Sequence, residues 1–481
     1  MKNMLLRALD TAKSRGATYA DVRMVKERRQ GITVKNGRVE ALTSGESSGF
    51  GVRVLTHGAW GFASSSRLEP KEMDRVVAEA AAIAAASATV SGPPVDLGEP
   101  RKMVANYRTP VIKDPFAVPL EERIDLLVRA SQEMARIKGI MVAEASMECL
   151  RQEKTFISTE GSHIQQEIVE TGCGLEATAV AEGEMQRRSY PNSVGRHQGT
   201  EGYEFVERYD LVANAPRIGE EAVVLLSAKP CPSGVTTVIL DGSQVALQVH
   251  ESCGHAVELD RVLGMEAGFA GTSFLTMDKL GNFRYGSPIV NITADATIPG
   301  GLGTFGYDDE GVPAQAVPIV REGILVGYLT SRETAAVLGQ KSGGAMRADG
   351  WNRIPLIRMT NVNLEPGGWR LENLIADTDD GIYMQTNKSW SIDDRRLNFQ
   401  FGTEMAWEIK GGKRGAMLKN ATYTGITPQF WASCDAICNR DHWVVWGTPN
   451  CGKGEPEQVA HVGHGAAPAR FRNVRVGVLK S

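Results

Sequence analysis

Apolar side chains recur at helical spacing in three segments of the first half of the chain, which predicts three amphipathic helices. The first helix lies near the start of the chain and is followed by Gly16, a residue type that often ends helices. The second helix spans roughly 70–88, and the third begins near Pro119. The apolar positions of these helices are Met4, Leu5, Ala8, Leu9 and Ala12; Met73, Val76, Val77, Ala80, Ile83 and Ala84; and Ile124, Leu127, Val128, Met134 and Ala135.

Between these helices, apolar and polar positions alternate, which predicts short β-strands. One N-terminal strand carries Val22 and Met24, and the Asn36-Gly37 pair predicts a hairpin turn. A helix followed by strands occurs twice, so we expect an α+β organisation for about 1–222. The later strand-like stretches occupy 141–149, 154–159, 163–170 and 174–182.

The second half of the chain is rich in glycine and lacks helical periodicity over most of its length. Short apolar runs between turn residues, such as 235–240 and 316–320, predict a large β-rich domain, with one helical exception over 243–260. The predicted fold class is therefore α+β: an N-terminal helix-plus-strands portion, followed by a large β-rich C-terminal domain that carries this helix. The predicted divisions are an N-terminal α+β domain over 1–92, a linker over 93–118, a central α+β domain over 119–222 and the β-rich domain over 223–481.

Charge and cysteine content exclude several classes of protein. The formal net charge is −4 and no long Lys/Arg run occurs, so the sequence indicates neither nucleic-acid binding nor an anionic membrane surface. Seven cysteines in a chain of 481 residues do not form the pattern of a secreted disulfide framework. The chain starts without a signal-peptide pattern, and no run approaches the roughly 18 apolar residues of a membrane helix. We therefore expect a cytoplasmic enzyme.

The chemistry is concentrated in the predicted helix over 243–260. It carries the sequence His250-Glu251-Ser252-Cys253-Gly254-His255 and can be capped by Ser243. Two neutral imidazoles and one further protein ligand bind zinc and leave one position for water. A glutamate beside the first ligand can accept the proton of that metal-bound water. These residue types are typical of metal-assisted hydrolysis.

The spacing of the two histidines predicts a distortion of the helix. Zinc-binding helices usually carry their histidines at i and i+4, about 40° apart around the axis, whereas His250 and His255 stand at i and i+5, about 140° apart. A regular α-helix would not direct both side chains at one ion. We therefore expect a π-bulge or a break between Ser252 and His255, eased by Gly254.

The metal motif and the segment that follows it, 258–264, resemble the TldD/PmbA family, and specifically its TldD branch. The resemblance extends over nearly the whole chain, and the metal segment is its most specific part. The other matching stretches are 49–54 with 60–63, an acidic turn over 307–313, the strand entry over 358–361, and the loop Cys451-Gly452-Lys453-Gly454.

This resemblance implies a zinc metallopeptidase that acts on unfolded or flexible peptides. It implies His250, His255 and Cys451 as the metal ligands and Glu251 as the general base. It also implies a dimer, either a homodimer or a heterodimer with a PmbA/TldE-like subunit that lacks the metal motif. A peptide substrate would then add as a strand to the β-rich domain.

Several alternatives remain open from the sequence alone. Cys253 is a second thiol beside the motif, and His461 and His464 are rival third ligands or donors to a developing oxyanion. Glu258 and Asp260 either orient a ligand histidine or form a solvated helix end. The alternative function is a non-catalytic peptide-binding or regulatory subunit with structural zinc, which a fourth donor such as Cys253 would favour. A weaker option is a hydrolase of a small non-peptide amide.

Overall fold

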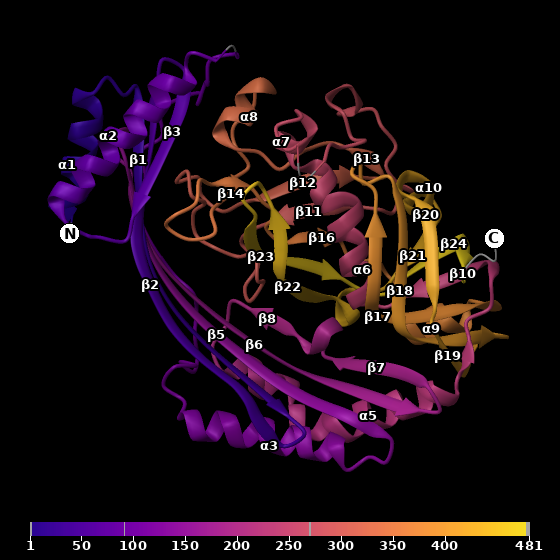
Figure 1. Ribbon diagram of the computed structural model, residues 1–481. Coiled ribbons are helices and arrows are strands. Elements are labelled where there is room, and N and C mark those ends of the chain that lie inside the picture. The colour runs from indigo at the N-terminus through magenta and orange to yellow at the C-terminus, as the bar shows by residue number, and fades with distance from the viewer. Residues whose placement is uncertain (1, 91, 269–270, 478–481) are drawn as a thin grey trace.

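The computed structural model describes residues 2–90, 92–268 and 271–477, and its first half is built on one long curved sheet (Figure 1). Strands β1 (Tyr19–Lys35) and β2 (Arg38–Thr56) form one antiparallel hairpin, and β5 (Ile140–Ser158) and β6 (His163–Ala181) form another. Because β1 also pairs with β5, the two hairpins join into a single sheet.

The predicted hairpin turn is confirmed, since Asn36 (φ 49°) and Gly37 (φ 74°) both occupy the left-handed region that such a turn requires. The strands themselves are longer than expected, at 17 residues for β1 and 19 residues for each of the other three. Polar residues midway along them do not end the strands, because they pair with charges on neighbouring strands or on the C-terminal half. Lys154, for example, donates to Asp309 at 3.2 Å.

Four shorter strands complete this sheet. One of them lies within the segment expected to be a linker and pairs in parallel with β6. Both N-terminal segments therefore contribute to one sheet, and the proposed domain boundaries stay a prediction. The shorter strands are β3 (Ala59–Ser65), β4 (Val104–Arg108), β7 (Glu184–Tyr190) and β8 (His197–Gly199).

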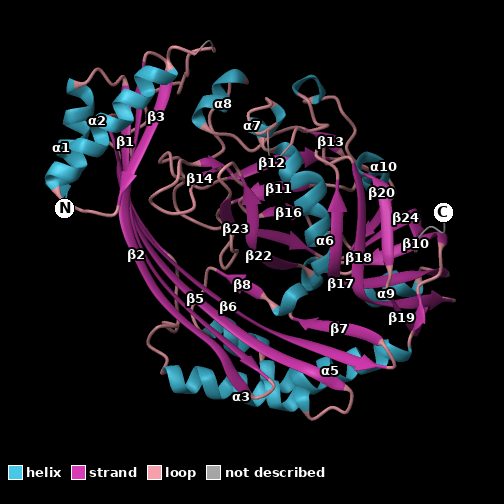
Figure 2. Ribbon diagram, in the orientation of Figure 1, coloured by secondary structure: helices cyan, strands magenta, loops and turns pink. Residues whose placement is uncertain are grey.

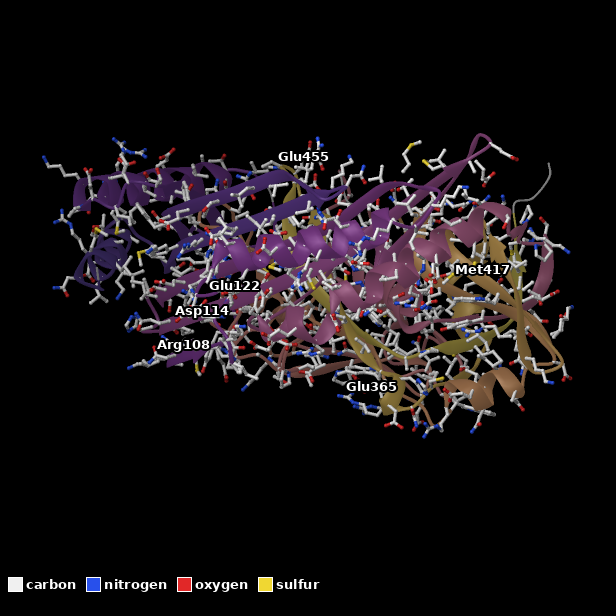
Figure 3. All side chains as sticks on the ribbon, turned by 90° about the horizontal axis from the view of Figure 1, so that it is seen from below. Arg108, Asp114, Glu122, Glu365, Met417 and Glu455 are labelled. Atoms are coloured by element: carbon white, nitrogen blue, oxygen red, sulfur yellow. The ribbon has the colours of Figure 1, made fainter. Side chains whose placement is uncertain are left out.

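Helices cover the outer face of the long sheet, and the three predicted ones are confirmed as α1 (Lys2–Ser14), α2 (Pro70–Ser87) and α3 (Leu120–Ala135). Helices α1 and α2 pack near the β1–β3 end, whereas α3 packs against β5 beside α5 (Leu211–Ser227) (Figure 2). Figure 3 shows α3, which carries Glu122, from below. Helix α5 was not predicted: its buried residues follow helical spacing, but Pro216 lies in its second turn.

The C-terminal half is β-rich, as the sequence predicted, and the concave face of the long sheet curves along two sides of it (Figure 1). One sheet contains β9 (Lys229–Pro230), β10 (Gly234–Leu240), β17 (Asp380–Ile392), β18 (Asn398–Lys410), β19 (Lys413–Lys419), β20 (Thr422–Ile426), β21 (Cys434–Ile437) and β24 (Ala469–Val476). A smaller sheet contains β11 (Ile292–Asp295), β12 (Ala316–Arg321), β13 (Ile324–Leu325) and β16 (Val362–Leu364). Two strand pairs are β14 (Met346–Arg347) with β15 (Leu356–Ile357), and β22 (Val444–Lys453) with β23 (Gln458–Ala466).

Helix α6 (Gly242–Val249) follows β10 and lies in the centre of this half, in contact with β17 and β23 (Figure 1). The remaining helices are short: α4 (Glu204–Tyr209), α7 (Leu259–Val262), α8 (Arg332–Val337), α9 (Leu371–Ala376) and α10 (Thr427–Ala432). Within the part of the chain that the structure describes, no helix has both the length and the apolar content to cross a bilayer.

Buried ion pairs join the two halves of the molecule. Arg53 of β2 donates to Asp21 at 2.7 Å and also reaches Glu310 at 3.3 Å. Asp308 accepts backbone hydrogen bonds, including one of 2.9 Å from Glu310. The acidic turn that the sequence singled out is therefore part of this interface, where its carboxylates already have partners.

The contact between β3 and α2 gives a test of the fold. Gly61 of β3 faces α2 so closely that a Cβ atom there would overlap the backbone of Ala80 and Ala84. We expect Gly61→Ala to lower the free energy of unfolding by about 1–3 kcal/mol, because neither backbone can give way. Calorimetric melting would measure this loss. Gly45→Ala is the matched control, since a Cβ at Gly45 meets nothing within 4 Å, and equal melting of the two variants would contradict this packing.

Candidate metal centre

The candidate site begins where β10 ends and α6 starts. Asp241 caps the helix, because its carboxylate accepts from the backbone N–H of Gln244 at 3.0 Å. The expectation that Ser243 caps the helix is wrong. Ser243 lies inside the first turn and donates its hydroxyl to the Asp241 carboxylate at 3.0 Å, so it supports the residue that makes the cap.

The helix then widens into a π-helical turn over His250–Gly254, followed by one tight turn over His255–Val257. The backbone N–H of His255 donates to the carbonyl of His250, five residues earlier, so the predicted distortion is confirmed. The extra residue rotates His255 back toward His250, and the two ring centroids lie 4.9 Å apart.

Gly254 is needed because it has no side chain, and not because it adopts unusual backbone angles. Its φ of −51° and ψ of −56° are ordinary helical values. A Cβ at this position would overlap the sulfur of Met359. From the sequence we expect the conformational freedom of glycine to ease the distortion, but these helical angles do not need it. Position 254 instead requires a residue without a Cβ, because Met359 lies directly beside it.

The structure brings His250, His255 and Cys451 together, as the sequence predicted. One ligand atom of each residue lies within 4.8 Å of the others, and all three side chains are buried. Cys451 comes from β22, just after a bulge in its pairing with β23, and its Sγ lies 3.5 Å from Nε2 of His255. Three donors from two distant segments of the chain thus converge on one point.

Hydrogen bonds fix which nitrogen of each histidine is available to a metal. Nδ1 of His464 donates to the carbonyl of Val362 at 3.0 Å, so Nε2 of His464 accepts from Nδ1 of His250 at 2.7 Å. Nδ1 of His255 donates to the Glu258 carboxylate at 3.0 Å. Both histidines therefore keep the lone pair of Nε2, the arrangement found in proteins that bind metals through imidazole.

Burial keeps the imidazoles neutral and the electrostatic surroundings favour the thiolate. Burial lowers the pKa of His250 and, more strongly, that of His255. Burial opposes ionisation of Cys451, whereas the positive charge of the Arg358 guanidinium favours the thiolate. Two neutral imidazoles and a thiolate form a donor set that suits zinc, so the residues present fit a metal ion.

The neighbouring candidates have other roles. Cys253 is not part of the donor cluster, and burial raises its pKa to about 12. His461 and His464 lie on β23: His464 supports His250, whereas His461 pairs with Glu170 at 2.5 Å. Glu258 contacts His255, one of the three candidate ligands, as one reading of the sequence expected. Asp260, by contrast, pairs with the buried Lys453 at 2.7 Å.

A cavity of about 450 Å³ opens onto the three donors, and Glu251 lines it. The Glu251 carboxylate accepts from Nη1 of Arg396 at 2.6 Å. Arg396 lies in the turn between β17 and β18, and sequence reasoning missed it. The two residues are 145 positions apart, and no motif at Arg396 signals the contact.

Comparisons with known proteins identify the family of this chain. The chain matches the models of PmbA/TldA metallopeptidase domain 1 over 20–84, of the central domain over 113–228 and of the C-terminal domain over 233–478. It is 33% identical to a metalloprotease of Methanocaldococcus jannaschii over 87% of this chain and 89% of that protein. It is 23% identical to a zinc metalloprotease TldD homolog of Saccharolobus solfataricus over 98% and 99% of the two chains.

Among solved structures, TldE from Thermococcus kodakarensis has the same fold, with a TM-score of 0.74 at 17% identity, over 99% of this chain and 100% of that one. Both of the relatives described above are named as metalloproteases. The resemblance first noted around the metal motif thus extends from domain 1 to the C-terminal domain, and the chain belongs to the PmbA/TldD metallopeptidase family.

Proposed function

We propose that this protein is a zinc metallopeptidase that hydrolyses unfolded or flexible peptides. In this proposal His250, His255 and Cys451 hold the metal and Glu251 is the general base. The observation that carries the proposal is the convergence of three buried donors, with both Nε2 lone pairs available, at the cavity that Glu251 lines. The name of the Saccharolobus solfataricus relative supports zinc as the metal.

A bound zinc ion would polarise the scissile carbonyl and make a water molecule more acidic. Glu251 takes the proton of the attacking water and then passes it to the leaving amine. Because one of the three ligands is an anionic thiolate, the water is less acidic than it would be with three neutral ligands, so the reaction depends more strongly on this base. The His464–His250 and Glu258–His255 hydrogen bonds hold the ligand rings in place.

The edge of β17 offers a place for the peptide backbone. Residues 387–392 of β17 pair with β18 along one side, whereas β10 pairs only with 382–384. Within the described parts of the chain, no strand pairs with the other edge of 387–392, and four residues of this stretch line the cavity. A peptide added along this edge would be held by main-chain hydrogen bonds, with limited selection of side chains.

The proposed assembly is a dimer, formed either with a second copy or with a TldE-like subunit. The similarity of the fold to TldE and the TldD name of a relative support such a pairing. The proposed location is the cytoplasm.

The alternative, a non-catalytic subunit with structural zinc, requires a fourth protein donor. Among the described residues, the cluster holds three donors, and Cys253 is not one of them. This count favours a catalytic site over a structural one.

Replacement of the proposed base separates catalysis from metal binding. We expect Glu251→Gln to lower kcat for an unstructured peptide by about 10²–10⁴-fold, because the amide cannot accept the proton of water. The zinc content per chain should not change, since Glu251 is not a proposed ligand. Kinetic assay and elemental analysis of the same preparation would measure both quantities, and an active Glu251→Gln protein would refute the mechanism.

Two cysteine substitutions test the ligand set. Cys451→Ala should lose most of its zinc, whereas Cys253→Ala, which removes a thiol equally buried and only two residues from His255, should keep it. Elemental analysis after dialysis would measure the ratio of zinc to protein. Loss of zinc from both variants would favour the structural alternative with Cys253 as a fourth donor, and retention of zinc in Cys451→Ala would contradict the proposed ligand set.

The histidine behind His250 should tune metal affinity. We expect His464→Ala to weaken zinc binding by about 10–100-fold, because His250 then loses the partner that fixes its ring. Competition with a chromophoric chelator would measure the affinity. His461→Ala is the control, since His461 lies three residues away on the same strand but pairs with Glu170; equal losses in the two variants would argue against this role.

A further inference from the structure

Arg396 occupies a rigid turn at the wall of the cavity. The residue adopts a left-handed backbone conformation, with φ of 65°, which residues other than glycine seldom do. Its carbonyl accepts from the hydroxyl of Thr427 at 2.8 Å, and the Asp393 carboxylate accepts from the backbone N–H of Leu397 at 2.8 Å. Contacts from both sides therefore fix the position from which the Arg396 side chain reaches Glu251.

The guanidinium of Arg396 uses only part of its hydrogen-bonding capacity. Nη1 donates to Glu251, but among the described residues neither Nε nor Nη2 has an acceptor, and Nε is buried. These two nitrogens form the side of the guanidinium that binds a carboxylate with two parallel hydrogen bonds. A buried donor without an acceptor is costly, so this side is suited to an acceptor supplied by a ligand.

The charge of the cavity points to the same kind of ligand. Its lining residues, as far as the structure describes them, include Arg196 and Arg396 but only one carboxylate, that of Glu251, which is already paired. Zinc on two neutral imidazoles and one thiolate would add a further positive charge. Such a cavity favours a substrate group that carries negative charge.

We propose that Arg396 binds a carboxylate of the peptide through Nε and Nη2, while Nη1 keeps its contact with Glu251. The preferred substrates are then peptides with a carboxylate near the scissile bond, either the free C-terminus or an Asp or Glu side chain. This inference rests on the proposed peptidase function for the identity of the ligand, but the binding step itself requires no turnover.

The experiment compares matched unstructured peptides that differ in one group. One pair has a C-terminal carboxylate or a C-terminal carboxamide, and the other has an internal Glu or Gln with both ends blocked. Calorimetric titration of the full chain after zinc removal gives the dissociation constants, and kcat/KM of the zinc-loaded protein gives a second readout. Circular dichroism before and after zinc removal checks that the fold is retained.

For the wild type we expect the carboxylate form of at least one pair to bind about tenfold or more tightly than its neutral counterpart. Arg396→Gln should reduce this ratio to about one, and Arg396→Lys should keep only part of it, because lysine lacks the planar pair of donors. Arg395→Gln is the matched control: Arg395 is the exposed neighbour in the same turn, and its loss should leave the ratio unchanged.

A preference in the first pair alone assigns the site to peptide C-termini, and a preference in the second alone assigns it to acidic side chains. Equal affinities within both pairs for the wild type, or a ratio that survives in Arg396→Gln, would overturn the proposal. The ratio is taken within one protein preparation, so partial loss of folded protein does not alter it. A protein that shows the ratio but hydrolyses no peptide would contradict the peptidase function and still support the Arg396 site.

Discussion

The candidate site depends on one extra residue in a helix turn. In a regular α-helix, His250 and His255 would point about 140° apart and could not share an ion. The π-helical turn over His250–Gly254 removes this angle, so that both imidazoles reach the same buried point. Such a turn is rarely favourable by itself, and the surroundings stabilise it. Met359 occupies the space beside Gly254, and the indole N–H of Trp431 donates to the hydroxyl of Ser252 at 2.9 Å within the turn.

The rest of the C-terminal half places partners around this turn. The β22–β23 hairpin supplies Cys451 on one strand and His464 on the other, so a single element provides a proposed ligand and the support of another. The carbonyl of Val362 sets the tautomer of His464, and His464 in turn sets that of His250. The β17–β18 turn contributes Arg396, which donates to Glu251. A backbone carbonyl, through His464, and the Glu258 carboxylate thus determine which nitrogen lone pairs of His250 and His255 face the centre.

Local patterns were sufficient to predict the helices α1 to α3, the Asn36-Gly37 turn and the distorted metal helix, because each depends on neighbouring residues. The cap was misassigned because Asp241 and Ser243 both suit a helix start, and only the structure shows which one accepts from Gln244. Strand lengths were underestimated because polar residues such as Lys154 find their charged partners more than a hundred residues away. Cys451 could be named only through family resemblance, and Arg396 could not be named at all, since each meets the helix through tertiary contacts alone.

The central claim is that two imidazoles and one thiolate hold zinc and leave a position for substrate. X-ray absorption spectroscopy at the zinc edge of the loaded protein tests this directly. The account predicts one sulfur at about 2.3 Å, two imidazole nitrogens at about 2.0–2.1 Å and one further light atom from solvent. A spectrum with two sulfur ligands, or with none, would contradict it.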